Sequence, residues 1–283
     1  MTLYLSDLDG TLLDKSACLP KEAALRINRM TARGVRITYA TARTVRSVSH
    51  ILADVDFTLP GAAPVALMNG VLVRDMRAGR YVGKETFSRE NAEKLSLLLT
   101  ECGAQPFVYT IDEGHIIDGD PLCTFYFEIS CPAMREFMEE RVIRYRKPFR
   151  KVASVRLIPG EIVYFCVLGP EETIKQAADR LERAGIAGIR YTFYRDAYKP
   201  DTWYLEIFSE TASKKHAVEF LRRMTGCGRV VCFGDNFNDL PMFEAADVSV
   251  AVTNAVDEVR KAADFLTDDV TGFIEECENG EHL

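Results

Sequence analysis

The start of the chain limits the possible folds most strongly. A short apolar run, Leu-Tyr-Leu-Ser at 3–6, ends directly in Asp-Leu-Asp-Gly-Thr at 7–11. The pattern recurs at 229–233, where an apolar run precedes Gly-Asp-Asn-Phe-Asn-Asp at 234–239. Each run predicts a buried strand with polar groups at its carboxyl end. This arrangement is typical of open α/β sheets, in which ligands bind outside the carboxyl ends of the strands.

Helical patterns separate the first predicted strands. Residues 20–34 begin with proline, carry an apolar stripe and end in glycine, which favours a helix. Further strands are expected at 35–39 and at 65–68, where Asn69-Gly70 indicates a hairpin turn. The opening therefore has a βαβαβ pattern, which implies a parallel sheet with helices on both faces.

The middle of the chain has a different pattern. It predicts two helices, at 88–102 and 171–184, and four separate strands, at 107–111, 124–129, 152–157 and 162–168. One strand pair is expected at 189–194 and 203–208. Alternating helix and strand return after residue 214. We therefore expect an α/β protein: a doubly wound, Rossmann-like parallel-sheet core formed by residues 1–83 and 208–283, with an α+β domain inserted at 84–207.

Composition argues against several classes of function. A net charge of −7 over 283 residues opposes binding to nucleic acid, whose phosphates need clustered Lys and Arg. No apolar run is long enough to cross a membrane. The eight cysteines include no CxxC pair, so a zinc site is unsupported. Because the N-terminus has no signal-peptide pattern, we expect reduced thiols in a cytoplasmic protein. Oligomeric state cannot be predicted from these features.

Polar groups at the predicted strand ends suggest a metal site. If the strand ends converge, Asp7, Asp9, Asp235 and Asp239 meet near the Thr41 hydroxyl. Four carboxylates in one crevice repel one another, and a hard divalent cation would relieve that repulsion. Mg²⁺ takes oxygen ligands and favours substrate phosphate as a further ligand. The sequence therefore predicts a magnesium site.

The same groups suggest phosphoryl transfer. Asp7 could attack phosphorus and form an aspartyl-phosphate. Asp9 could protonate the leaving oxygen and then deprotonate the water that cleaves the intermediate. Lys214 is a candidate cation for the phosphoryl group, and Thr41 and the backbone at Gly10 could hold its oxygens.

Four segments resemble motifs of the haloacid-dehalogenase-like (HAD) superfamily. They are Asp-Leu-Asp-Gly-Thr-Leu-Leu at 7–13, Ala-Thr-Ala-Arg at 40–43, Ala-Ser-Lys-Lys at 212–215 and Gly-Asp-Asn-Phe-Asn-Asp at 234–239. Asn69-Gly70 and Val-Ala-Val-Thr-Asn-Ala at 250–255 resemble the Cof-type phosphatase branch in particular. That branch usually has glycine where this chain has Ala42, which affects the fit of a substrate near Arg43.

The resemblance implies an HAD-like phosphatase. It makes Asp7 the nucleophile and Asp9 the general acid and base, and it assigns phosphoryl binding to Thr41 and Lys214. The substrate would be a small phosphorylated metabolite, such as a sugar phosphate, and residues 84–207 would form a cap that selects it. A phosphosugar mutase is one alternative. A non-catalytic or signalling phospho-acceptor protein is another.

The resemblance also implies how magnesium binds. The ion would be held by Asp7, the Asp9 carbonyl and Asp235, with Asp239 in support.

Other polar residues have open alternatives. Asn69 is a turn residue first, and with Gly70 it could also contact substrate. Arg43 fits a surface charge or a substrate contact equally well, and Lys215 is a rival for the role of Lys214. Glu206 could face the site or could be a solvent-facing residue that alternates with its apolar neighbours.

Two further groups complete the candidates. Asn236 and Asn238, in the fourth motif, are candidates for substrate contact or for support of the site. The basic run at 141–151 is interpreted as a solvated surface, with attraction of an anionic substrate as the alternative.

Overall fold

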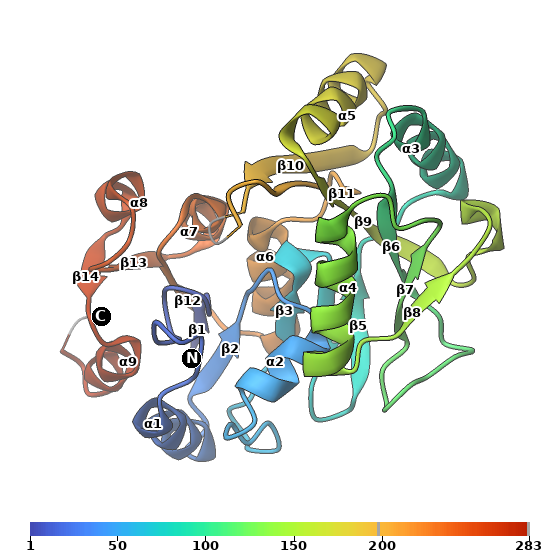
Figure 1. Ribbon diagram of the computed structural model, residues 1–283. Coiled ribbons are helices and arrows are strands. Elements are labelled where there is room, and N and C mark those ends of the chain that lie inside the picture. Colours follow the sequence, from blue (N-terminus) through green and yellow to red (C-terminus); the bar gives the residue numbers. More distant parts are fainter. Residues whose placement is uncertain (197–198, 282–283) are drawn as a thin grey trace. The chain divides into compact units, whose positions relative to one another are not determined.

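The computed structural model describes residues 1–196 and 199–281, which form two compact units. The first unit comprises residues 1–83 and 213–283, and the second comprises residues 84–212 (Figure 1). The border predicted after residue 207 falls inside a strand, Trp203–Ser209, and the second unit extends to Ala212. Within the described residues, no helix has the length and apolar character that crossing a membrane requires.

A five-stranded parallel sheet forms the centre of the first unit, in the order β14-β13-β12-β1-β2. The strands are β1 (Thr2–Ser6), β2 (Arg36–Tyr39), β12 (Arg229–Gly234), β13 (Val248–Val252) and β14 (Phe265–Thr267). β1, β12 and β13 are buried along nearly their whole length, which explains why their sequences are unbroken apolar runs.

Helices cover both faces of this sheet (Figure 1). They are α1 (Lys21–Ala32), α2 (Val45–Ile51), α6 (Lys214–Thr225), α7 (Leu240–Ala245), α8 (Asp257–Ala262) and α9 (Val270–Glu278). α1 packs beside α9, while α7 contacts both α6 and α8. The doubly wound α/β core predicted from the sequence is confirmed.

The strand predicted at 65–68 joins the parallel sheet only through isolated parallel bridges. β3 (Val65–Leu67) pairs antiparallel with β4 (Leu72–Asp75), and β5 (Arg80–Lys84) completes a three-stranded sheet. Isolated parallel bridges connect this segment to the region of β2. The Asn69-Gly70 hairpin therefore determines the pairing of β3. Asn69 takes the left-handed conformation that such a turn needs, with φ 56° and ψ 31°.

The second unit is an α+β domain with a six-stranded sheet, in the order β10-β11-β9-β6-β7-β8. Its strands are β6 (Pro106–Ile111), β7 (Leu122–Tyr126), β8 (Phe149–Lys151), β9 (Glu161–Gly169), β10 (Ile189–Arg195) and β11 (Trp203–Ser209). The pairs are antiparallel except β7 with β8. The helices are α3 (Arg89–Glu101), α4 (Pro132–Tyr145) and α5 (Glu171–Ala184).

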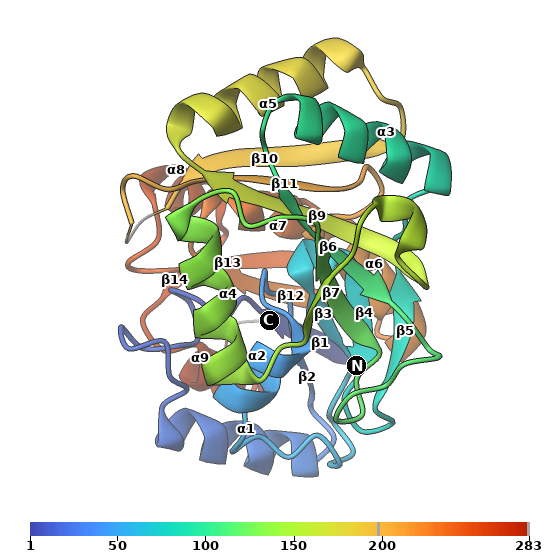
Figure 2. The ribbon, with the colours of Figure 1, turned by 45° about the vertical axis from the view of Figure 1, so that its right-hand side comes forward.

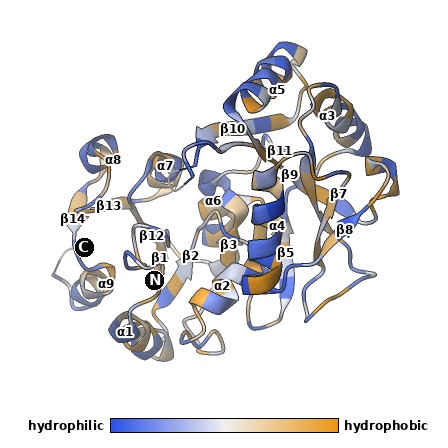
Figure 3. Cartoon of the chain, viewed as in Figure 1, coloured by the Kyte–Doolittle hydropathy of each residue, from blue (hydrophilic) through white to orange (hydrophobic). Residues whose placement is uncertain are grey.

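The two faces of this sheet differ. α3 and α5 lie side by side on one face (Figure 2), where Leu95 and Leu181 join a buried core with Val167, Leu205 and Ile207. α4 packs on the opposite face, where its Phe137 stacks on Phe107 with ring centroids 5.2 Å apart. The helices carry both hydrophobic and hydrophilic residues (Figure 3), as expected for helices with one packed side.

Two features of the second unit differ from the sequence prediction. α4 was not predicted, because its apolar residues do not form a clear helical stripe and few of them are buried, chiefly Met134 and Phe137. The strand expected at 152–157 is instead a 3₁₀ turn, η2 (Val155–Leu157), which follows the short strand β8.

Candidate active site

Three carboxylates meet at the carboxyl ends of β1 and β12. These strands are neighbours in register, with Ser6 opposite Phe233, and Asp7 and Asp235 directly follow them. Asp239 belongs to a 3₁₀ turn, η3 (Phe237–Asp239). Each residue offers a carboxylate oxygen within 4.8 Å of those of the other two. Oxygen ligands that converge in this way suit a hard divalent cation.

Lys214, the first residue of α6, binds two of these carboxylates. Its Nζ donates to Asp7 Oδ1 at 2.6 Å and to Asp239 Oδ1 at 2.5 Å, and the side chain is 1% exposed. Ser213 caps the helix by accepting a hydrogen bond from the His216 amide. Lys215, the rival for this role, pairs at the surface with Glu244. The first turn of α6 therefore directs Lys214 into the carboxylate cluster.

Charges in the cluster are unbalanced, with three carboxylates and one ammonium group. Burial raises the pKa of Asp7 to about 7, with repulsion from Asp239 adding to it and Lys214 opposing it. Burial and the charge of Asp239 also raise the pKa of Asp235 to about 6. For Lys214, burial lowers the pKa, but the charges of Asp7 and Asp239 outweigh this effect and raise it. A bound cation would relieve the excess negative charge.

The Asp9 side chain lies outside this cluster. Its Oδ2 accepts a hydrogen bond from Arg43 Nε at 2.7 Å, its Oδ1 also bonds to the guanidinium, and the residue is exposed. Arg43 in turn donates to Ser47 Oγ at 3.0 Å. Of the four carboxylates predicted to converge, Asp9 is the one whose oxygens are not among the three that meet, although its charge acts on Asp235. A two-point Arg–carboxylate pair is among the strongest hydrogen-bonded contacts available to Asp9 in this turn.

Gly10 and Thr41 lie at the same edge of the sheet. Gly10 has φ +80°, and a Cβ at this position would lie 2.3 Å from Asp235 Oδ2, so only glycine fits without displacing that carboxylate. Thr41 is buried, its Oγ1 accepts from the Arg43 amide at 3.2 Å, and its carbonyl accepts from the Asn69 amide at 2.9 Å. Both residues are thus fixed in place by local contacts.

Residues of the fourth motif support the cluster. Asp239 Oδ2 accepts from the amides of Asp235 at 2.9 Å and Asn236 at 3.1 Å, which fixes the loop after β12. Asn236 caps η3 through its hydrogen bond with the Phe237 amide. A Cβ at Gly234 would lie 2.6 Å from Cβ of Asp239, so the absence of a side chain lets Asp239 approach the strand.

The asparagines and glycine of the other motifs also lie in the first unit. Asn238 Nδ2 donates to Asn69 Oδ1 at 3.5 Å, a long contact between two candidate residues. Gly70 has φ +92°, and a Cβ there would lie 2.2 Å from the Ser213 carbonyl, so the hairpin packs directly against the start of α6. Glu206 belongs to the second unit, on β11.

Two contacts were not predicted individually. Thr11 Oγ1 donates to Asp235 Oδ1 at 3.1 Å, and Asn254 Nδ2 donates to the Gly10 carbonyl at 2.8 Å. Both residues lie within segments that resemble HAD motifs, and this position was the sign in the sequence that they belong to the site.

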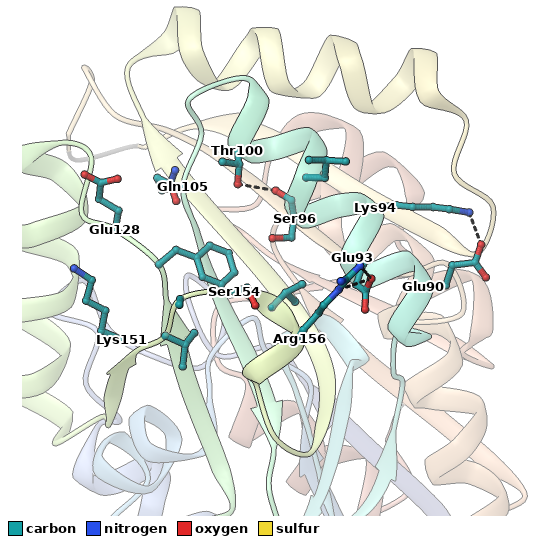
Figure 4. A pocket seen from close by; sticks show the side chains of 15 residues that line it. Glu90, Glu93, Lys94, Ser96, Thr100, Gln105, Glu128, Lys151, Ser154 and Arg156 are labelled. Atoms are coloured by element: carbon teal, nitrogen blue, oxygen red, sulfur yellow. Dashed lines mark hydrogen bonds and ion pairs between the residues drawn. The ribbon is translucent and has the colours of Figure 1, made fainter.

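A hollow of about 1160 Å³ lies in the second unit, between α3 and residues 151–156 (Figure 4). At its rim, Lys94 pairs with Glu90 at 2.7 Å and Arg156 with Glu93 at 2.8 Å. These charges pair with each other and do not converge on a common point. The hollow therefore lacks the chemistry of the carboxylate cluster.

Comparison with known proteins identifies the family. A family model for haloacid dehalogenase-like hydrolases matches residues 4–272. The chain belongs to this family. The superfamily predicted from the motifs is therefore confirmed, and the match spans both units.

Individual HAD relatives cover nearly the whole chain. YxeH of Bacillus subtilis, named as a putative phosphatase, is 30% identical over 92% of this chain and 90% of its own length. The 5-amino-6-(5-phospho-D-ribitylamino)uracil phosphatase YwtE, also from B. subtilis, is 24% identical, with 98% of each chain covered. The crystal structure of TM0651 from Thermotoga maritima has the same fold, with a TM-score of 0.75 at 20% identity and coverage of 97% and 96%.

Proposed function

We propose that this HAD family member is a magnesium-dependent phosphomonoester hydrolase that acts through an aspartyl-phosphate. The observation that carries the proposal is the cluster of three carboxylates, in which buried Asp7 contacts the ammonium of Lys214. The substrate class is a small phosphorylated metabolite such as a sugar phosphate. The family and the phosphatase names of its relatives support a phosphorylated substrate.

The residues of the cluster fit a magnesium ion. They are hard oxygen donors, and the raised pKa values of Asp7 and Asp235 reflect burial and repulsion that a divalent cation would offset. Asp7 and Asp235 would hold the ion directly, with Asp239 in support and the Asp9 main-chain carbonyl as a further ligand. When bound, magnesium neutralises charge that develops on the phosphoryl group.

Asp7 and Asp9 perform the covalent chemistry in this proposal. An Asp7 carboxylate oxygen attacks phosphorus, and the bond from phosphorus to the ester oxygen breaks. Asp9 gives that oxygen a proton, then takes a proton from the water that attacks the aspartyl-phosphate, which releases phosphate and regenerates Asp7. Because Asp9 pairs with Arg43 here, it must exchange this contact for the ester oxygen.

Other residues position the phosphoryl group. The ammonium of Lys214, already bonded to Asp7 and Asp239, would attract the phosphoryl oxygens and hold the nucleophile in place. The hydroxyl of Thr41 would bind a phosphoryl oxygen. We assign selection of the substrate to the second unit, as the cap.

The test is phosphate release from phenyl phosphate by the whole protein. We expect turnover with Mg²⁺ and loss of turnover with EDTA. Asp7→Asn should lower kcat by more than about a thousandfold, because the nucleophile is removed while the shape is kept. Lys215→Ala, which alters a surface pair, is the control.

Each other outcome points to a different function. Full activity of Asp7→Asn would exclude the covalent mechanism. Isomerised sugar phosphate without free phosphate would favour a mutase. A long-lived aspartyl-phosphate without turnover would favour a phospho-acceptor protein.

A further inference from the structure

The hollow between α3 and residues 151–156 is lined entirely by residues of the second unit (Figure 4). On α3, Leu97 and Thr100 line it, and their spacing places them on one face of the helix. Leu95 and Leu99, on another face of α3, are buried in the core of the unit. Leu97 is 62% exposed, so the helix presents an uncovered apolar side chain to the hollow.

Apolar groups also form the opposite wall of the hollow. Phe127 follows β7 and Val152 follows β8, and both are only partly buried against the core. Val155, in the turn η2, continues this wall. The volume is about 1160 Å³, and pockets that bind small molecules are typically about 300–1,000 Å³ and mostly apolar. The hollow therefore has the room and the aromatic contact that a flat apolar ring requires.

Gln105, which directly precedes β6, brings an unused hydrogen-bond acceptor to the hollow (Figure 4). Its Oε1 is buried, and among the described residues no group donates a hydrogen bond to it. A buried acceptor that is left without a donor costs about 1–3 kcal/mol. The terminal amide of glutamine turns easily about its last bond, so Oε1 can meet a donor that enters the hollow.

Thr100 adds a second acceptor. Its hydroxyl donates to the Ser96 carbonyl at 2.8 Å, so the proton is already engaged and the oxygen is left to accept. The polar groups of Gln105 and Thr100 therefore favour a ligand that donates hydrogen bonds.

Charges around the hollow favour a neutral ligand. The charged lining residues comprise three acids and three bases: Glu90, Glu93, Glu128, Lys94, Lys151 and Arg156. Four of them form two ion pairs, Lys94 with Glu90 at 2.7 Å and Arg156 with Glu93 at 2.8 Å. A charged ligand would lose hydration here without meeting an excess of opposite charge, whereas a neutral ligand avoids this cost.

We propose that the hollow is a second ligand site, which binds a neutral aromatic heterocycle with a ring N–H. The apolar walls cover the ring, and Gln105 Oε1 accepts the N–H. The site belongs to the second unit alone and does not depend on the proposed phosphatase function. A purely structural role for Gln105 leaves its buried oxygen unexplained, because buried polar groups in proteins are almost always hydrogen-bonded.

The test compares benzimidazole with 1-methylbenzimidazole at pH 8, where both rings are neutral and differ in the N–H. NMR titration of the isotopically labelled whole protein measures each Kd. We expect a Kd of about 10 mM or lower for benzimidazole, in keeping with its few atoms. The methylated ring should bind about fivefold more weakly, because it cannot donate a hydrogen bond to Gln105.

Variants of the lining locate the site. Gln105→Met removes the acceptor at similar length, and it should bring the two Kd values to within about twofold of each other. Ala153→Trp, at an exposed lining position, should occupy part of the hollow and weaken benzimidazole binding about tenfold or more. Ala184→Trp, at an exposed position of α5 outside the lining, is the matched control and should bind as the wild type does. Thermal unfolding shows whether each variant is folded.

Several results would overturn the proposal. They are equal Kd values of the two rings for the wild type, unchanged binding by folded Ala153→Trp, and no benzimidazole binding at about 10 mM. Binding of benzamidinium or benzoate about tenfold more tightly than benzimidazole would also overturn it, because the site would then select a charge. If Gln105→Met fails to fold, the two rings and Ala153→Trp still decide the question.

Discussion

Asp7 in the first unit and Glu206 in the second are both carboxylates whose pKa is raised by burial. Their surroundings differ in the kind of group that stabilises the charge. Asp7 pairs with an ammonium and lies beside two more carboxylates, whereas the hydrogen-bond partner of Glu206 is a neutral hydroxyl, that of Thr192, 3.5 Å away. The first setting suits charged ligands, a metal ion and a phosphoryl group.

The largest expected effect on folding comes from removing the cation of the first site. Lys214→Met would leave two buried carboxylates without their ammonium partner, and we expect a loss of about 3–5 kcal/mol in the free energy of unfolding. Urea unfolding measures this loss, and added Mg²⁺ should restore part of it by supplying positive charge. Lys215→Met, at an exposed pair, should change stability little.

Stability without magnesium should fall as pH rises from 5.5 to 8. The pKa of Asp7 is about 7 in the folded protein, well above its ordinary value, so the folded state binds a proton more tightly than the unfolded state. This contribution is complete at low pH and is lost as pH rises through about 7. Asp7→Asn lacks the titrating group and should show a weaker dependence in thermal unfolding.

Magnesium should reverse this trend, because protons and the metal compete for the same carboxylates. At a free concentration of 100 times its Kd, Mg²⁺ should stabilise the protein by about 2.7 kcal/mol at pH 8 and by less at pH 5.5. Glu206→Gln should respond to the metal as the wild type does. Equal stabilisation of the wild type at both pH values would contradict the charge-based description of the first site.

The smallest expected effect tests the neutral partners in the second unit. Thr192→Val removes the hydroxyl that lies 3.5 Å from Glu206 Oε2, and we expect a loss of about 1 kcal/mol in the free energy of unfolding. Tyr191→Phe, on the other face of the sheet, should cost less. If Thr192→Val were as stable as the wild type, the hydroxyl would not stabilise this carboxylate, and the contrast between the two sites would weaken.

The same contrast explains how much could be predicted from the sequence. Parallel strands place their carboxyl ends at one edge, so the meeting of Asp7 with Asp235 follows from two apolar runs that end in acids. The direction of Asp9 depends on its turn and on Arg43, which lies 34 residues later, and it was not predictable. The Asn-Gly turn was recognised and its strand does bridge in parallel to the region of β2, but the third strand of the small sheet, β5, was not predicted.

In the second unit, the residues that Glu206 contacts depend on which strands pair and in which register, and the sequence alone does not reveal this. Alternation along β11 left two orientations open for Glu206, because it does not reveal which face is covered by helices. Its partner Thr192 comes from β10, and the pairing of β10 with β11 decides that the two residues lie opposite each other. α4 was missed because a mostly polar helix has no clear apolar stripe.

Gly10 and Gly234 have a consequence for inherited variation in this chain. A methyl group at either position would collide with the acid beside it, Asp235 or Asp239, while the apolar interior of the sheet would be untouched. An alanine at Gly10 should therefore remove activity at a cost of only about 1 kcal/mol in backbone strain. At Gly234 it should also destabilise the protein, because Asp239 pairs with the buried Lys214. A survey that scores abundance alone would overlook the first change.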